Sequence, residues 1–180
     1  MQAKTLILLG DSITEAFPTE KLSDEYKIIN KGVYGDNTSG VLSRLNKDVI
    51  SHYPDVIYIL IGTNDLAQER TDEEIIKTLH LIIDKLTSSL VLAEIYLTSI
   101  LPTLDIANRP NARIDELNQK IKILSDRFGI QYFNLADDFK DDQGKMKKEL
   151  TEDGLHLSNE GYQLWRSVLR QKLSTKITAA

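Results

Sequence analysis

One serine, one histidine and one aspartate in this 180-residue chain stand in sequence contexts that suit nucleophilic catalysis. Ser12 follows a glycine and an aspartate directly after an apolar run, while Asp153 and His156 lie together near the other end of the chain. A serine hydroxyl becomes a nucleophile when a base accepts its proton and a third group orients that base. We therefore predict Ser12 as the nucleophile, His156 as the base and Asp153 as the acid that orients the base.

Three hydrogen-bond donors could stabilise the negative charge that such a reaction develops on a carbonyl oxygen. The candidates are the backbone N–H groups of Ser12 and Gly35 and the side-chain amide of Asn64. Gly35 suits this role because the absence of a side chain lets its N–H group approach a ligand closely. One donor of this kind typically contributes roughly 10²–10³ in rate. We predict that these three groups form an oxyanion hole, although Asn64 taken alone could instead cap a helix.

The elements that must position these residues can be predicted from hydropathy. Continuous apolar runs at 5–9 and 56–61 are typical of strands that are buried on both faces of a parallel sheet. The predicted strands, in chain order, are 5–9, 26–30, 56–61, 93–100 and 130–135. The predicted helices are 38–50 with Thr38 or Ser39 as its cap, 71–86, 113–127 and 159–173. Strands that alternate with helices predict an α/β fold with a mostly parallel sheet covered on both faces.

The natural strand order for five such strands is 2-1-3-4-5. This order places the first and third strands side by side, so that Ser12 and Asn64 follow neighbouring strands at the edge where open α/β sheets bind ligands. A helix after Ser12 would also direct its N-terminal amides toward that edge. We expect Asp11 to hold the turn by accepting backbone hydrogen bonds, rather than to serve as the catalytic acid. Read alone, the segment around Ser12 would also suit a simple turn in which the serine caps a helix.

Four segments of the chain resemble the sequence blocks of the SGNH/GDSL hydrolases, a family that includes lipases, acylhydrolases and platelet-activating-factor acetylhydrolase-like members. They are Gly10-Asp11-Ser12-Ile13-Thr14, Asn30-X-Gly32-X-X-Gly35, Gly62-Thr63-Asn64-Asp65 and Asp153-Gly154-Leu155-His156. Their order and spacing are also similar, and they span residues 10–156. The resemblance implies a flavodoxin-like three-layer α/β/α fold and ester hydrolysis through an acyl-serine intermediate, with the residue roles given above. Ile13 stands where the family name has leucine, which is an aliphatic exchange.

Composition narrows the class of protein further. The formal net charge of −5 argues against nucleic acid as a partner, and the absence of cysteine excludes disulfides and thiolate metal sites. No apolar run approaches the roughly 18 residues that span a membrane. The first residues lead directly into the first strand and leave no room for a signal peptide. We expect one cytoplasmic domain over residues 1–180 that needs no metal or cofactor, takes a small-molecule acyl ester and could form a homo-oligomer.

The leading hypothesis is a serine esterase that acts on small or short-chain acyl esters, acetyl esters above all. The loop 102–112 would form one wall of the site, and Tyr34, Leu104 and Ile106 would offer only modest apolar surface. A lysophospholipase, a thioesterase or a catalytically silent carbohydrate- or lipid-binding relative are the alternatives.

Two other interpretations fit the residues less well. A phosphorylated receiver module would need a second acid beside Asp11 and a lysine after the fifth strand, and the sequence offers neither. The acidic run at 137–142 does not match EF-hand spacing, and it is predicted as a solvated loop.

Overall fold

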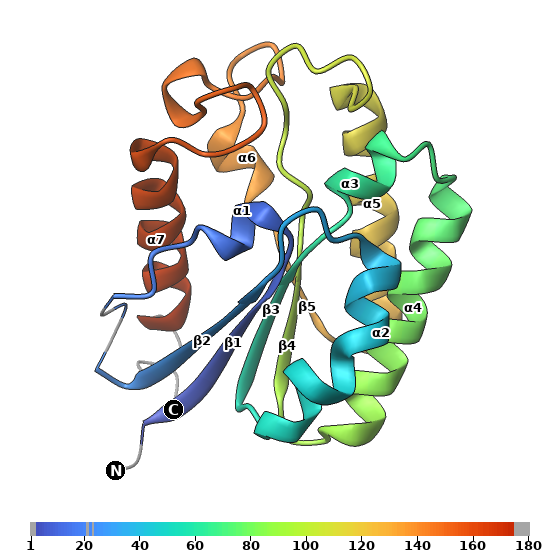
Figure 1. Ribbon diagram of the computed structural model, residues 1–180, viewed down its shortest axis with the longest axis vertical. Helices are drawn as coiled ribbons and strands as arrows, with labels where there is room; N and C mark the ends of the chain where they lie inside the picture. The colour runs from blue at the N-terminus through green and yellow to red at the C-terminus, as the bar shows by residue number, and fades with distance from the viewer. Residues whose placement is uncertain (1–2, 21, 23, 175–180) are drawn as a thin grey trace.

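The computed structural model describes residues 3–20, 22 and 24–174 and shows one parallel sheet between two helical layers (Figure 1). The strands are β1 (Lys4–Gly10), β2 (Tyr26–Gly32), β3 (Val56–Leu60), β4 (Glu94–Thr98) and β5 (Gln131–Phe133). The helices are α1 (Ser12–Glu15), α2 (Thr38–Asp48), α3 (Thr63–Ala67), α4 (Asp72–Ser89), α5 (Asn111–Phe128), α6 (Ala136–Phe139) and α7 (Asn159–Ser174), with 3-10 turns at Ile50–His52 and Lys148–Leu150. The sheet order is β2-β1-β3-β4-β5, so the predicted fold class and strand order are confirmed.

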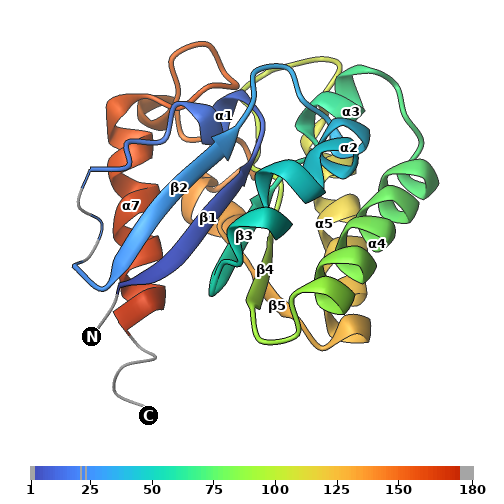
Figure 2. The same ribbon diagram turned by 60° about the horizontal axis from the view of Figure 1, so that its bottom comes forward.

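Successive side chains of the central strand β1 point to opposite faces of the sheet and belong to a different hydrophobic core on each face. Ile7 and Leu9 pack into one hydrophobic cluster with α2, α4 and α5, whereas Leu6 and Leu8 pack into a second cluster with α6 and α7. All four side chains are at most 1% exposed. Successive side chains of a strand point to opposite faces, so a strand covered on both faces must be apolar throughout. Figure 2 shows the two helical layers on either side of the sheet.

The carboxyl ends of β1, β2 and β3 lie together at one edge. Gly10 is paired in register with Gly32 on one side and with Leu60 on the other, so the segments that follow these strands start next to one another. A Cβ atom on Gly32 would lie 2.0 Å from the backbone nitrogen of Glu15, which means that α1 packs directly on the end of β2. The loops after the strands therefore gather at the upper edge in Figure 1.

Asn30 ties α1 to β2 at this edge. Its Nδ2 group donates to the Thr14 carbonyl oxygen at 2.7 Å, and its Oδ1 atom accepts from the Gly32 N–H group at 2.8 Å. From α7, on the side of α1 away from β2, the Tyr162 hydroxyl donates to the Ile13 carbonyl oxygen at 2.8 Å. The short helix that carries Ser12 is thus held from two sides.

Two local predictions are wrong. Neither Thr38 nor Ser39 caps α2, because Asn37 is the cap and its Oδ1 atom accepts from the Gly40 N–H group at 2.9 Å. The Thr38 hydroxyl instead donates to the buried Asp65 carboxylate at 2.6 Å. The acidic run at 137–142 is not simply a solvated loop, since its first residues belong to α6 (Ala136–Phe139) and the side chain of Phe139 is fully buried.

Candidate active site

Ser12, His156 and Asp153 form a continuous chain of hydrogen bonds at the carboxyl edge of the sheet. The Ser12 Oγ atom lies 3.1 Å from His156 Nε2, and His156 Nδ1 lies 2.7 Å from Asp153 Oδ2. A carboxylate can only accept, so Nδ1 carries the proton and Nε2 presents its lone pair to the serine hydroxyl. The geometry is therefore that of a nucleophile, a base and an orienting acid.

A tight turn places the acid against the histidine. The second carboxylate oxygen of Asp153, Oδ1, accepts from the N–H groups of Leu155 at 2.9 Å and of His156 at 2.7 Å. Burial opposes ionisation of this carboxyl group, but the hydrogen bonds from His156 and Leu155 outweigh it and lower the pKa of Asp153 to about 2. Asp153 is therefore a carboxylate at any pH where the imidazole could act as a base.

Asp11 caps the helix that carries Ser12. Its Oδ1 atom accepts from the Ile13 N–H group at 2.9 Å, as predicted, and the side chain is 1% exposed. Burial raises the pKa of Asp11 to about 7; the Asp36 charge acts in the same direction, while the Ile13 N–H group and the charges of His156 and Arg109 oppose it. Asp11 is a structural acid beside the triad, and its protonation changes near neutral pH.

This raised pKa predicts the effect of replacing Asp11 by asparagine. Between about pH 4 and pH 7 the folded protein keeps a proton that the unfolded chain has released, so the free energy of unfolding falls as the pH rises. Asparagine keeps the acceptor for Ile13 but cannot ionise. We expect the Asp11→Asn variant to gain stability over the wild type across this interval, by up to about 4 kcal/mol at pH 8.

Urea unfolding of both proteins from pH 4 to pH 8 measures this gain. All other titrating groups are shared by the two proteins, so the difference between their unfolding free energies isolates the Asp11 carboxyl. A difference that does not vary with pH would contradict a raised pKa at this position.

Gly35 and Asn64 are joined at the same edge of the sheet. The Asn64 Nδ2 group donates to the carbonyl oxygen of Asp36, the residue after Gly35, at 2.8 Å. Gly35 has a positive φ of 72°, a conformation that glycine adopts without strain. Within the part of the chain that the structure describes, the N–H groups of Gly35 and Ser12 have no acceptor. Asn64 does not cap α3, because Gly62 occupies the cap position.

Two arginines support this edge and were not predicted from the sequence. Arg44 of α2 donates to the carbonyl oxygens of Gly10 at 3.0 Å and Lys31 at 2.9 Å, and it forms an ion pair with Asp36 at 2.8 Å. Arg109 of the loop 102–112 donates to Asn64. Both contacts join residues that are distant in sequence, so no local pattern signals them. The ion pair with Arg44 fixes the Asp36 side chain, and with it the loop that carries Gly35.

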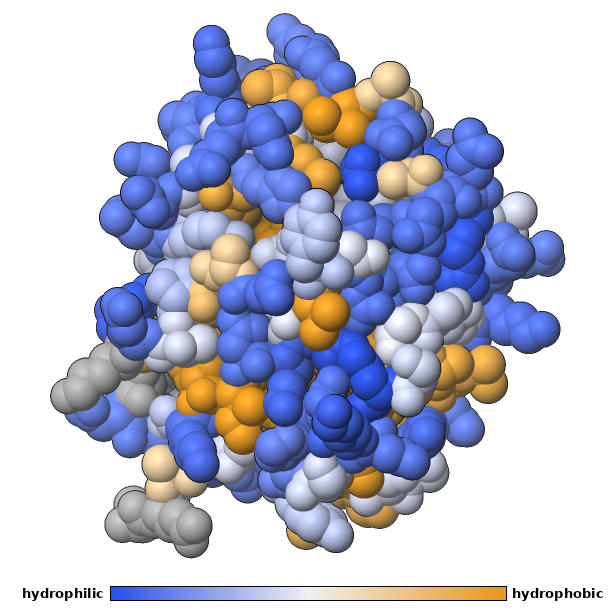
Figure 3. Space-filling view, viewed as in Figure 1, coloured by the Kyte–Doolittle hydropathy of each residue, from blue (hydrophilic) through white to orange (hydrophobic). Residues whose placement is uncertain are grey.

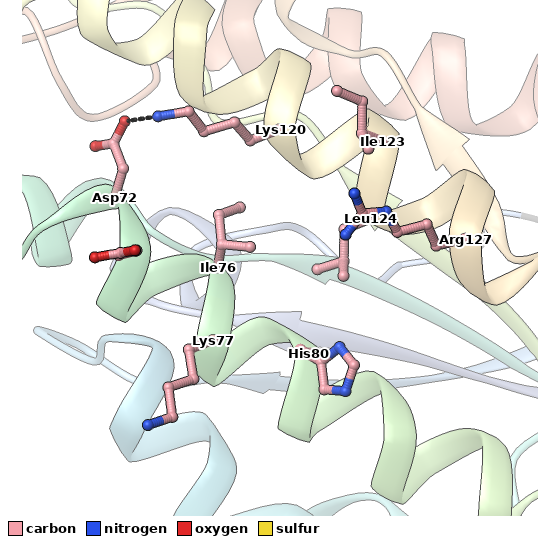
Figure 4. A pocket seen from close by; sticks show the side chains of 9 residues that line it. Asp72, Ile76, Lys77, His80, Lys120, Ile123, Leu124 and Arg127 are labelled. Atoms are coloured by element: carbon pink, nitrogen blue, oxygen red, sulfur yellow. Dashed lines mark hydrogen bonds and ion pairs between the residues drawn. The ribbon is translucent and has the colours of Figure 1, made fainter.

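A sizeable hollow lies away from this site. It has a volume of about 510 Å³ and lies between α4 and α5 (Figure 4). It is lined by Asp72, Glu73, Ile76, Lys77, His80, Lys120, Ile123, Leu124 and Arg127. None of the predicted catalytic or oxyanion residues is among them. The geometry of reactive groups, rather than the size of a cavity, therefore locates the candidate active site.

The apolar hollow beside the triad is small. It is lined in part by Asp11, Ile13 and Leu155, the chain neighbours of Ser12 and His156, and its volume is about 10 Å³. Tyr34, which was expected to provide apolar surface, is 77% exposed. On the face seen in Figure 3, apolar atoms occur in separate small patches between hydrophilic side chains. Among the described helices, none has the length and apolar character needed to cross a membrane.

The parallel three-layer fold, with a serine, histidine and aspartate hydrogen-bonded at the carboxyl edge of its sheet, is that of a hydrolase. Comparison with known families gives the narrower assignment. The sequence model of the GDSL-like Lipase/Acylhydrolase family matches residues 8–164, and the chain belongs to this family.

Individual relatives agree with this assignment. A solved structure from Streptococcus pneumonia, provisionally described as a platelet activating factor, is 32% identical, covers 96% of this chain and 85% of its own, and superposes with a TM-score of 0.88. An acetyl xylan esterase shares the fold, with a TM-score of 0.80, 22% identity and coverage of 93% of this chain and 98% of that chain.

A curated relative is a longer protein. The chain is 28% identical over 163 residues to an N-acylneuraminate cytidylyltransferase from Escherichia coli O18:K1:H7 (strain RS218 / NMEC). The match covers 87% of this chain and 37% of that protein, so the chain spans little more than a third of the relative's length.

Proposed function

We propose that this protein is a serine esterase that cleaves small or short-chain acyl esters, acetyl esters above all, through an acyl-serine intermediate. One observation carries the proposal, namely the hydrogen-bonded chain from Ser12 Oγ through the imidazole of His156 to the carboxylate of Asp153. Membership in an acylhydrolase family supports the reaction class.

The reaction begins with proton transfer. His156 Nε2 accepts the hydroxyl proton of Ser12 as the Oγ atom attacks the ester carbonyl carbon, and the imidazolium that forms is stabilised by Asp153. The negative charge that develops on the carbonyl oxygen is met by the N–H groups of Ser12 and Gly35 and by the Asn64 amide. His156 then protonates the leaving alcohol as its bond to the acyl carbon breaks.

The second half of the reaction restores the enzyme. Water replaces the alcohol and gives a proton to His156 Nε2 while its oxygen attacks the acyl carbon. The bond to Ser12 Oγ breaks, and the serine oxygen recovers its proton from the imidazolium. The products are one carboxylic acid and one alcohol, so the proposed reaction needs no reactant other than the ester and water.

Two features favour a short acyl group. The apolar hollow beside the triad, at about 10 Å³, has room for no more than about one water molecule and cannot enclose a long alkyl chain. A structural neighbour with the same fold is by name an acetyl xylan esterase, so this fold is compatible with removal of an acetyl group.

Two measurements test the proposal. Hydrolysis of p-nitrophenyl acetate, butyrate and octanoate is expected to fall as the acyl chain lengthens. An alkyl fluorophosphonate should phosphonylate Ser12, which is the only serine in the tryptic peptide 5–21, and peptide mass spectrometry locates the adduct. An adduct on another peptide would remove Ser12 from the chemistry. Equal or rising rates with chain length would instead overturn the preference for short acyl groups.

A further inference from the structure

Arg109 lies behind the proposed oxyanion hole, in the loop that joins β4 to α5. Its Nη2 atom donates to the Oδ1 atom of Asn64 at 3.1 Å, and its Nε atom donates to the carbonyl oxygen of Thr63 at 3.0 Å. We propose that Arg109 is a positioning residue that fixes and polarises the Asn64 amide for the oxyanion. This inference rests on the proposed function, in which that amide is an oxyanion donor.

The hydrogen bonds of the amide leave one donor for a ligand. The Oδ1 atom of Asn64 accepts from Arg109, and one hydrogen of Nδ2 is donated to the Asp36 carbonyl oxygen at 2.8 Å. A primary amide carries two N–H donors, so the second N–H bond of Asn64 is available. With both its oxygen and one hydrogen engaged, the amide plane cannot rotate freely, and the direction of the second N–H bond is set.

The guanidinium also acts through its charge. A hydrogen bond from a cation to Oδ1 is stronger than one between neutral groups, and it draws electron density away from Nδ2. The N–H group that faces the reacting oxygen thereby becomes a better donor. The Arg109 guanidinium is only partly buried and keeps its positive charge. The negative charges of Asp11 and Asp153 favour this positive charge from across the site.

The loop itself holds Arg109 in place. The Arg109 carbonyl oxygen accepts from the Thr103 hydroxyl at 2.9 Å, and the Asn111 side chain bonds both backbone groups of Thr103 at 2.8 Å. The next residue, Leu104, donates its N–H group to the carbonyl oxygen of Gly154 at 2.8 Å, within the turn that carries Asp153 and His156. One loop therefore braces the acid–base turn and Asn64 together.

Steady-state kinetics with p-nitrophenyl acetate test the inference. We expect Arg109→Met to lower kcat by roughly 10–100-fold with little change in KM, because an oxyanion donor acts mainly in the transition state. Arg109→Lys should recover only part of the loss, since a single ammonium group cannot bond Thr63 and Asn64 in the same fork geometry. Full activity in Arg109→Lys, or a change confined to KM, would overturn the positioning role.

A double variant separates this role from general damage to the fold. Asn64→Ala removes the amide through which Arg109 acts, so adding Arg109→Met to that variant should change kcat less than about twofold. Losses that multiply in the double variant would contradict the inference. Arg113→Met is the matched control, because Arg113 is a partly buried arginine that bonds Asp72 and the Arg70 carbonyl oxygen, and it should keep wild-type kcat.

A spectroscopic measurement decides the positioning role even if the enzyme hydrolyses no ester. In a ¹⁵N-labelled protein, the Asn64 side-chain amide signals, assigned by their loss in Asn64→Ala, should shift in Arg109→Met and stay in place in Arg113→Met. Unmoved Asn64 signals in Arg109→Met would overturn the contact. Shifted signals in a protein without esterase activity would instead reject the proposed function and retain Arg109 as the residue that holds Asn64.

Discussion

Replacing Ser12 by alanine is expected to lower kcat/KM for p-nitrophenyl acetate by about 10⁴-fold or more, because the proposed mechanism has no other nucleophile to form the acyl intermediate. The only side-chain hydrogen bond of Ser12 within the described residues is the one to His156, so the fold should be retained. Initial rates measure the loss, and circular dichroism with thermal unfolding confirms the fold.

The matched control for this experiment is Ser39→Ala. Ser39 is exposed in the first turn of α2, four residues after Gly35, and it has no role in the proposed mechanism. Its removal should leave kcat/KM within about twofold of the wild type. If Ser12→Ala and Ser39→Ala hydrolyse the ester at similar rates, the acyl-serine mechanism is wrong for this chain.

Replacing Asp153 by asparagine is expected to lower kcat by roughly 10²–10⁴-fold, because it favours the tautomer of His156 that cannot act as a base toward Ser12. The Oδ1 atom of asparagine can still accept from the N–H groups of Leu155 and His156, so the turn is kept. The new amide nitrogen would face His156 Nδ1 and donate to it, which moves the imidazole proton to Nε2. That nitrogen then cannot take the proton of Ser12.

Asp153→Ala is the comparison that tests this explanation. Alanine removes the acceptor without adding a donor, so the correct tautomer stays accessible and this variant should retain more activity than Asp153→Asn. A pH–rate profile of each variant, with the wild type beside them, measures the difference. Because the pKa of Asp153 is about 2, its protonation should not set the acid limb of the wild-type profile above pH 4. An Asp153→Asn variant with wild-type kcat would exclude Asp153 from catalysis.

The features that could be predicted from the sequence are those with a local signature. Residues 6–9 of β1 and 56–60 of β3 are hydrophobic and buried at every position because both faces of a central strand are covered, and this pattern identifies them without tertiary information. Ser12 and the Asp153–His156 pair follow from short segments in which the residue types themselves carry the chemistry. Their contact across the chain follows from the strand order, which few topologies satisfy.

The features that were missed depend on contacts between distant segments. The cap of α2 is one example, because Asn37, Thr38 and Ser39 are all residue types that cap helices. Only the tertiary contact of the Thr38 hydroxyl with Asp65 leaves Asn37 as the cap. Arg109 sits in an irregular loop, where no periodicity predicts the direction of a side chain. The acidic run at 137–142 is predicted as a solvated loop from its charges, although Phe139 within it is buried against distant residues of the core.

The close packing of α1 on the end of β2 sets Ser12 apart from the other two residues of the candidate active site. Ser12 stands on a helix held by Asn30 and by the Tyr162 hydroxyl, and this helix packs against Gly32 with no space between them. The side chains of His156 and Asp153, in contrast, are 37% and 55% exposed on a surface turn. In the proposed mechanism the attacking serine is therefore held within the fold, whereas the two groups that handle its proton border the solvent.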